Sequence, residues 1–232
     1  MENRIVSGSS AQLSERSFVS KVFLWMSFGL ALSTASSFAL LSQPLMLRAL
    51  FGNQWAIIGV FVAEIALVIW LSVRIQAMSA ALASSIFCVY SILNGVTVSA
   101  VLLAYTGASV MQTFAITAGT FFFFSLYGLT TKKDLTSMGG LAVMALIGLI
   151  IASVVNTFLK SSGLMWVITF VGIAIFVVLI AYDTQKLKTM HAMGFENESA
   201  EKKMVVIGAL ALYLDFINLF MMLLNLFGKR RD

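Results

Sequence analysis

The sequence predicts an all-α polytopic membrane protein with seven transmembrane helices, and its composition and hydropathy pattern carry this prediction. Hydrophobic residues make up 60% of the 232 residues and charged residues only 11%, whereas charged residues make up roughly a quarter of a soluble domain. Seven apolar runs each approach or exceed the roughly 20 residues that cross a hydrocarbon core as a helix. The net charge of +5 lies in short loops beside these runs, so we expect contacts with the lipid bilayer and no binding of nucleic acid.

The chain begins with a polar segment, residues 1–21, that we expect to form a cytoplasmic tail. The apolar run after it is longer than the core of a secretory signal and lacks a clean cleavage site, so we expect it to remain as a helix. One transmembrane domain then fills residues 22–228, and residues 229–232 form a basic tail. The expected spans cover approximately residues 22–41, 54–73, 79–104, 109–130, 139–159, 164–185 and 204–227.

The distribution of Lys and Arg predicts a cytoplasmic N-terminus. With seven crossings, ten basic residues lie on the inner side and five on the outer side, and positive charge favours the cytoplasmic side. Three of the outer five, Lys229, Arg230 and Arg231, would return to the inner side if the seventh run were re-entrant. That run covers residues 204–227, which is long enough to span, so we favour a full crossing.

The longest connection, residues 186–203, carries seven Lys and Glu residues, and we expect a loop in water. It contains His191, the only histidine, and the only cysteine is Cys88. With one residue of each type, no His/Cys metal site can be built, and we expect no cofactor. His191 is interpreted as a solvated loop residue.

Small residues are expected to make the helix contacts, because apolar burial gives no driving force between helices in lipid. Asn94 and Asn156 lie beside two of three such sets and are further candidates for lining a polar path. The three sets that share a helix face are Gly29, Ser33 and Ser37; Ser91, Gly95 and Ser99; and Gly140, Gly148 and Ala152.

Two acids within apolar runs are the main functional candidates, because carboxylates at membrane depth are costly and usually face a bundle interior or a water-filled path. Asp183 lies near the inner end of the sixth run, and Asp215 lies deeper in the seventh. Antiparallel neighbours put both in the same half of the membrane, and two carboxylates in contact titrate as a unit. We therefore predict a pH-sensitive pair. The alternative for Asp183 is an interfacial acid paired with Lys186 or Lys188.

The seventh run also carries a polar stripe on an otherwise apolar helix. Such a helix fits a central position with its stripe facing a cavity, which makes Asn218 a candidate for lining a path. At 100° per residue, the residues on this face are Gly208, Ala211, Asp215, Asn218 and Asn225.

The second run adds one acid and one base. Glu64 and Arg74 are ten residues apart, so both can lean toward one neighbouring helix. Glu64 lies deep enough to line a path. Arg74 lies at the inner end, where it can either contact Asp183 as a latch or extend to lipid phosphate.

Three segments resemble motifs of the Bax inhibitor-1 family, the transmembrane Bax inhibitor motif proteins, and the overall pattern is most similar to the bacterial inner-membrane branch. The likeness runs from about Lys21 to Gly228. The segments are Ala-Tyr-Asp-Thr-Gln at 181–185, Tyr-Gly-Leu-Thr-Thr-Lys-Lys-Asp-Leu at 127–135, and Leu-Tyr-Leu-Asp-Phe-Ile-Asn-Leu-Phe at 212–220.

This resemblance implies six helices around a central seventh and a pH-sensitive calcium leak. The resemblance maps the family's paired aspartates, its pH sensor, onto Asp183 and Asp215, and its second-helix latch arginine onto Arg74. Calcium takes six to eight oxygen ligands. The two carboxylates with Asn218, Glu64, carbonyls and water would therefore form a weak, partly hydrated calcium site, as conduction requires.

Three other functions compete with the leak. An intramembrane aspartyl protease also uses two carboxylates, but Leu212-Tyr213-Leu214 replaces the Gly-x-Gly of those enzymes and the only proline is Pro44, so we expect no enzyme. A proton-coupled transporter would use the same acids as a relay. A protein that binds and restrains other membrane proteins would need the acids only for internal packing.

Overall fold

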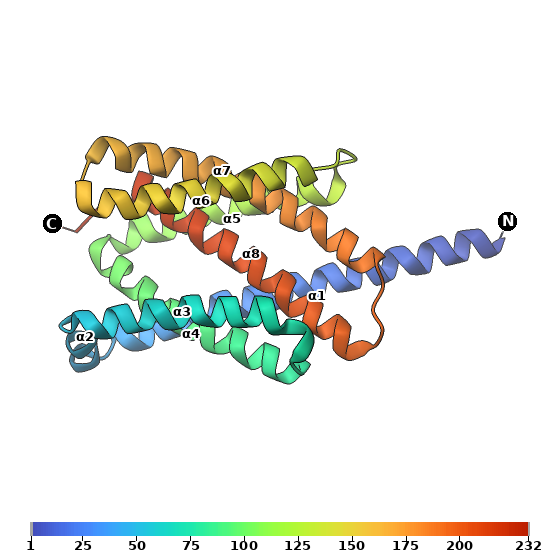
Figure 1. Cartoon of the computed structure of the whole chain (residues 1–232), viewed down its shortest axis with the longest axis horizontal. Helices are drawn as coiled ribbons and strands as arrows, with labels where there is room; N and C mark the ends of the chain where they lie inside the picture. The colour runs from blue at the N-terminus through green and yellow to red at the C-terminus, as the bar shows by residue number, and fades with distance from the viewer. Residues whose placement is uncertain (1, 232) are drawn as a thin grey trace. The chain divides into compact units, whose positions relative to one another are not determined.

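The computed structural model describes residues 2–231, with side chains for residues 13–231, and its regular secondary structure consists of helices joined by short connections. Seven of the α-helices are long and apolar enough to cross a membrane, and only α2 is not. This confirms the predicted all-helical chain with seven candidate spans. The helices are α1 (Glu2–Leu41), α2 (Pro44–Phe51), α3 (Gln54–Arg74), α4 (Ala80–Ala104), α5 (Gly107–Thr130), α6 (Thr136–Leu159), α7 (Ser162–Ala192) and α8 (Glu198–Phe227) (Figure 1).

The predicted loop at residues 186–203 is wrong for most of its length. Helices α7 and α8 extend into it and leave only residues 193–197 between them. Lys and Glu are good helix formers, so a polar sequence does not end a helix by itself. The break comes at Gly194, whose φ of +74° is readily adopted by glycine and stops a helix. At the other end of the chain, α1 begins at Glu2 and includes the segment expected as a tail.

The short helix α2 was not expected, because eight residues are too few to mark a span. Pro44 occupies its first turn, where the missing backbone N–H of proline costs nothing. Asn53 then caps α3 by accepting a hydrogen bond from the Trp55 amide at 3.0 Å. The two features turn the chain from α1 into α3.

The first of two compact units contains residues 1–104 and 189–213. Its helices α1 and α4 meet through the first two predicted sets of small residues. Ser33 Oγ donates to the Ser91 carbonyl at 2.7 Å, and Ser37 Oγ donates to the Gly95 carbonyl. A Cβ atom on Gly95 would lie 2.2 Å from the Ser33 carbonyl oxygen. These packing seams are confirmed.

The second unit contains residues 105–188 and 214–232. Here α6 and α7 run side by side (Figure 1), and a Cβ atom on Gly139 would lie 2.3 Å from the Tyr182 ring. The third predicted seam is wrong, because Gly140 and Gly148 have nothing within 4 Å of an added Cβ. Periodicity identifies residues that share a face, but it does not tell which face meets a helix and which meets lipid.

Helix α8 is the most buried of the seven candidate spans. In its apolar 18-residue stretch 61% is buried inside the protein, against 44% or less in the corresponding stretches of the other spans. It is unbroken over 30 residues. In the second unit, the Thr106 amide donates a hydrogen bond to the Lys229 carbonyl at 2.9 Å, and the backbones of Tyr105 and Arg230 form an isolated antiparallel β-bridge. The chain after α8 therefore lies beside the residues that precede α5, as a full crossing of the seventh span requires.

Candidate functional site

The side chains of Asp183 on α7 and Asp215 on α8 lie close enough within the second unit to act on each other electrostatically. Asp215 is only 5% exposed, Asp183 is half-buried, and the Oδ2 atom of Asp215 has no hydrogen-bond partner among the described residues. Two carboxylates that interact in a buried place do not both ionise readily. The pair is therefore a place where a proton or a cation can compensate buried charge.

The lysines that follow Asp183 differ in what they contact. Lys186 acts electrostatically on Asp183, and its Nζ lies 5.8 Å from the centre of the Tyr182 ring. Lys188 instead donates to the Leu129 carbonyl on α5 at 3.0 Å. Asp183 is thus influenced by two charged or chargeable groups, the buried carboxyl group of Asp215 and the ammonium group of Lys186.

The segment 127–135 holds α7 in position around Asp183. A Cβ atom on Gly128 would lie 2.3 Å from the Ala181 carbonyl oxygen, so only glycine allows this approach of α5 to α7. Gln185 donates from Nε2 to the Lys133 carbonyl at 2.8 Å and accepts from the Leu135 amide at 2.9 Å. The segment 127–135, which is far from α7 in the sequence, therefore holds the turn of α7 that contains Asp183.

Aromatic packing holds α8 beside the same helices. Phe216, the neighbour of Asp215, meets Phe114 and Phe121 of α5 edge to face, with 5.5 Å between ring centres in each case. Such contacts add about 0.5–1.5 kcal/mol beyond the buried area. They fix the rotation of α8 that directs Asp215 into the protein.

Asp134 is a further acid in this region, exposed in the connection between α5 and α6. Its Oδ1 accepts a hydrogen bond from the Thr136 amide at 2.9 Å, and hydrogen bonds from Thr136 lower the pKa of Asp134. Its carboxylate stays ionised at neutral and mildly acidic pH. Asp134 is therefore a fixed charge.

The amides of the predicted stripe on α8 are engaged in different ways. Asn218 is half-buried and donates from Nδ2 to the Leu214 carbonyl of its own helix at 2.8 Å. Asn225 donates from Nδ2 to Thr169 Oγ1 on α7 at 2.9 Å. This hydrogen bond of Asn218 uses the amide nitrogen and does not involve the amide oxygen Oδ1. Oxygen is the type of ligand that calcium prefers.

Glu64 and Arg74 lie on α3 in the first unit. Glu64 is 8% exposed, and its Oε1 accepts a hydrogen bond from Thr97 Oγ1 of α4 at 2.6 Å. Arg74 is exposed at the end of the helix. The two residues therefore occupy different environments, one inside the unit and one at its surface.

The first unit also contains a buried polar cluster that sequence reasoning did not predict. The Tyr213 hydroxyl donates to Asn94 Oδ1 at 2.8 Å and lies 2.6 Å from Ser33 Oγ, and the tyrosine is fully buried. A tyrosine in an apolar run is usually a packing residue. The signal that was available is its place two residues before Asp215 on the same helix.

His191 is not the solvated loop residue that we expected. It is half-buried in the last turn of α7, with its ring centre 5.6 Å from Phe18 and 5.9 Å from Phe195. Its Nδ1 atom is buried without a partner among the described residues. The continuation of α7 and the turn at Gly194 account for this position, because they bring Phe195 back over the ring.

The sequence matches the model of a protein family described as "Inhibitor of apoptosis-promoting Bax1" over residues 15–232. It is 46% identical over 217 residues to Inner membrane protein YbhL of Escherichia coli strain K12, covering 93% of each chain. A protein of Borreliella burgdorferi is 40% identical over 220 residues, covering 95% of each chain. A protein of Deinococcus radiodurans is 42% identical over 223 residues, covering 94% of this chain and 92% of the relative.

Proposed function

This chain belongs to the Bax inhibitor-1 family of membrane proteins, and on this basis we propose that it is a pH-sensitive, calcium-permeable leak channel gated by Asp183 and Asp215. It is a multi-pass protein of the inner membrane, with seven candidate spans and a close relative of that location. Its N-terminus is cytoplasmic and it performs no enzymatic reaction. Calcium and protons are its small-molecule partners.

The observation that supports this proposal is that the Asp183 and Asp215 side chains lie within one unit and act on each other electrostatically. At high pH an ionised Asp183 attracts Arg74, which serves as a latch that holds the path closed. At acid pH the neutral carboxyl group loses this attraction and the path opens. Calcium flux is therefore higher at acid pH than at alkaline pH.

The ion path follows the polar stripe of α8, which stands at the centre of the other six spans. The high burial of α8 supports this arrangement. Asp183 and Asp215 form a weak calcium site there, and Asn218 and Glu64 line the path. Calcium needs six to eight oxygen ligands, so the ion keeps part of its hydration shell and leaves the site readily.

The test is calcium flux in proteoliposomes at pH 6 and pH 8, with the wild type beside the double variant Asp183→Asn/Asp215→Asn. The wild type should pass more calcium at pH 6. The double variant keeps the shape of both side chains but cannot ionise, so its flux should be the same at the two pH values.

The variant Asp134→Asn is the matched control, because it removes an exposed carboxylate from the same unit and should leave the pH dependence intact. Uphill accumulation of calcium would instead favour a proton-coupled transporter. Flux no greater than that of empty liposomes at both pH values would refute the leak and favour a protein that restrains other membrane proteins.

A further inference from the structure

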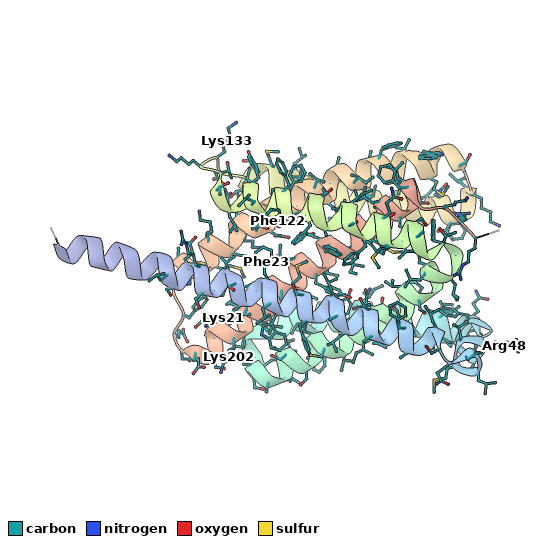
Figure 2. The ribbon with its side chains drawn as sticks, turned by 180° about the vertical axis from the view of Figure 1, so that it is seen from behind. Lys21, Phe23, Arg48, Phe122, Lys133 and Lys202 are labelled. Carbon is teal, nitrogen blue, oxygen red and sulfur yellow. The ribbon has the colours of Figure 1, made fainter. Side chains whose placement is uncertain are left out.

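A cavity of about 520 Å³ opens in the first unit, between the first turns of α4 and α8 and the adjoining face of α1. Its size falls within the roughly 300–1,000 Å³ of small-molecule sites. Lys21, which lines it, directly precedes the apolar run of α1. Lys21 and Lys202 lie toward one end of this unit and Arg48 at the other (Figure 2). With the cytoplasmic N-terminus proposed above, the cavity lies at the inner boundary between membrane and water.

Four charged side chains of alternating sign border the cavity. Lys21 Nζ lies 2.7 Å from Glu201 Oε1, and Lys202 Nζ lies 2.8 Å from Glu198 Oε1. Lys21 also acts on Glu198, and Glu201 acts on Lys202, so the four charges form one network. Exposed ion pairs of this kind contribute little and rearrange at little cost. The border can accept an anion and a cation at the same time.

The remaining lining combines apolar side chains with a helix end. Leu24 is 69% exposed, and Trp25 beside it is oriented by edge contacts with Phe28 at 5.9 Å and Phe87 at 6.2 Å. Tryptophan is enriched at this depth of a membrane. The first turn of α4 also lines the cavity, and the amides of a helix N-terminus favour phosphate.

We propose that this cavity binds an inner-leaflet phospholipid whose headgroup carries a phosphate and a primary ammonium, as in phosphatidylethanolamine. The phosphate contacts Lys21, Lys202 and the start of α4, and the ammonium contacts Glu198 and Glu201. An acyl chain follows the apolar surface of α1. This site does not depend on the ion pathway described above.

The charge pattern distinguishes this headgroup from the other common ones. A purely anionic headgroup such as phosphatidylglycerol pairs with the lysines but faces two carboxylates without a counter-charge. Phosphatidylcholine has the right charges, but its trimethylammonium group has no N–H to donate to a carboxylate. A primary ammonium with a phosphate satisfies all four side chains.

The experiment measures lipid retention by native mass spectrometry of the full-length protein, released from nanodiscs of equimolar phosphatidylethanolamine, phosphatidylcholine and phosphatidylglycerol with identical acyl chains. The wild type should retain phosphatidylethanolamine about two- to fivefold over phosphatidylcholine, the ratio expected for one or two exposed charged contacts. Glu198→Gln/Glu201→Gln should bring this ratio to about one.

The control is Glu196→Gln, which removes an exposed acid from the adjacent connection, outside this cavity, and should keep the wild-type ratio. The single variant Glu198→Gln, whose side chain is 79% exposed, serves if the double variant does not fold, and it should lower the ratio. Equal retention of the two lipids by the wild type, preferred retention of phosphatidylglycerol, or an unchanged ratio in a folded Glu198→Gln variant would each overturn the proposal.

Discussion

Tyr213 and Asp215 lie two residues apart on α8, and both bring a polar group into a buried environment. The Tyr213 hydroxyl hydrogen-bonds with Ser33 and Asn94 in the first unit. Asp215 instead interacts electrostatically with Asp183 in the second unit. Hydrogen bonds between membrane helices contribute modestly to stability, because the polar groups also find partners when the helices separate. One stretch of helix thus contains a structural polar group and a candidate functional one.

The first prediction at this scale concerns the hydroxyl of Tyr213. Tyr213→Phe removes the group that Asn94 and Ser33 contact and leaves the ring packing against Phe87 and Tyr90. We expect a loss of about 1 kcal/mol of stability, because the hydroxyl makes two contacts and an interhelical hydrogen bond in a membrane protein contributes about 0.6 kcal/mol on average. Equilibrium unfolding in mixed detergent micelles measures this loss.

Tyr127→Phe is the matched control, because Tyr127 is 41% exposed, and its unfolding free energy should stay within about 0.5 kcal/mol of the wild type. An equal loss in both variants would show that the Tyr213 hydroxyl contributes nothing specific. The calcium flux of Tyr213→Phe should keep its pH dependence, since Asp183 and Asp215 are unchanged.

Single polar residues in apolar runs can be found from the sequence, but their partners cannot. Asp183, Asp215 and Glu64 stand out because charge at membrane depth is costly. His191 was misinterpreted because its surroundings depend on where α7 ends, and Gly194 determines that end. Tyr213 was overlooked because a tyrosine gives the same signal whether its hydroxyl is bonded or not.

At the scale of the helices, glycine determines how closely α5 approaches α7. Gly128 faces the Ala181 carbonyl, two residues before Asp183, while Gly119 on the same helix has nothing within 4 Å of an added Cβ. Substituting alanine at each of these two glycines therefore separates the effect of an added methyl group at a helix contact from its effect on helix propensity.

Gly128→Ala should therefore destabilise the protein by about 1–3 kcal/mol, the usual cost of adding volume to a packed contact. Gly119→Ala should be neutral or stabilising by up to about 1 kcal/mol, because alanine favours the helix. Unfolding of both variants in the same detergent measures the difference. Equal stabilities would mean that α5 and α7 are not in close contact at Gly128.

The helices themselves were largely predictable, and their contacts only in part. Bilayer thickness sets a minimum apolar length, so each expected span corresponds to a helix. The small-residue faces that contain Ser33 and Ser91 were predicted correctly as packing faces, because small residues permit close approach, but the sequence did not show that these two faces meet each other. Gly140 and Gly148 follow the same pattern on α6 without a partner, since the sequence carries no signal that separates lipid from protein on an apolar helix.

At the scale of the whole molecule, the number of crossings determines where the ends of the chain lie. A cytoplasmic N-terminus and seven crossings put the chain after α8 on the outer side. Alkaline phosphatase fused to the C-terminus should then be active, because its disulfides form only in the oxidising compartment outside the membrane. A fusion after Asn197, in the connection between α7 and α8, should be inactive. The reverse result would refute this orientation.

The backbone hydrogen bond from the Thr106 amide to the Lys229 carbonyl has an electrical consequence. If α8 crosses fully, Lys229, Arg230 and Arg231 stand on the positive side of an energised membrane, and moving each charge there costs about 2.3 kcal/mol per 100 mV. The burial of α8 and the backbone hydrogen bond at Thr106 oppose this force. In that orientation these contacts would hold the last helix across the membrane against the voltage, which would pull its tail back toward the cytoplasm.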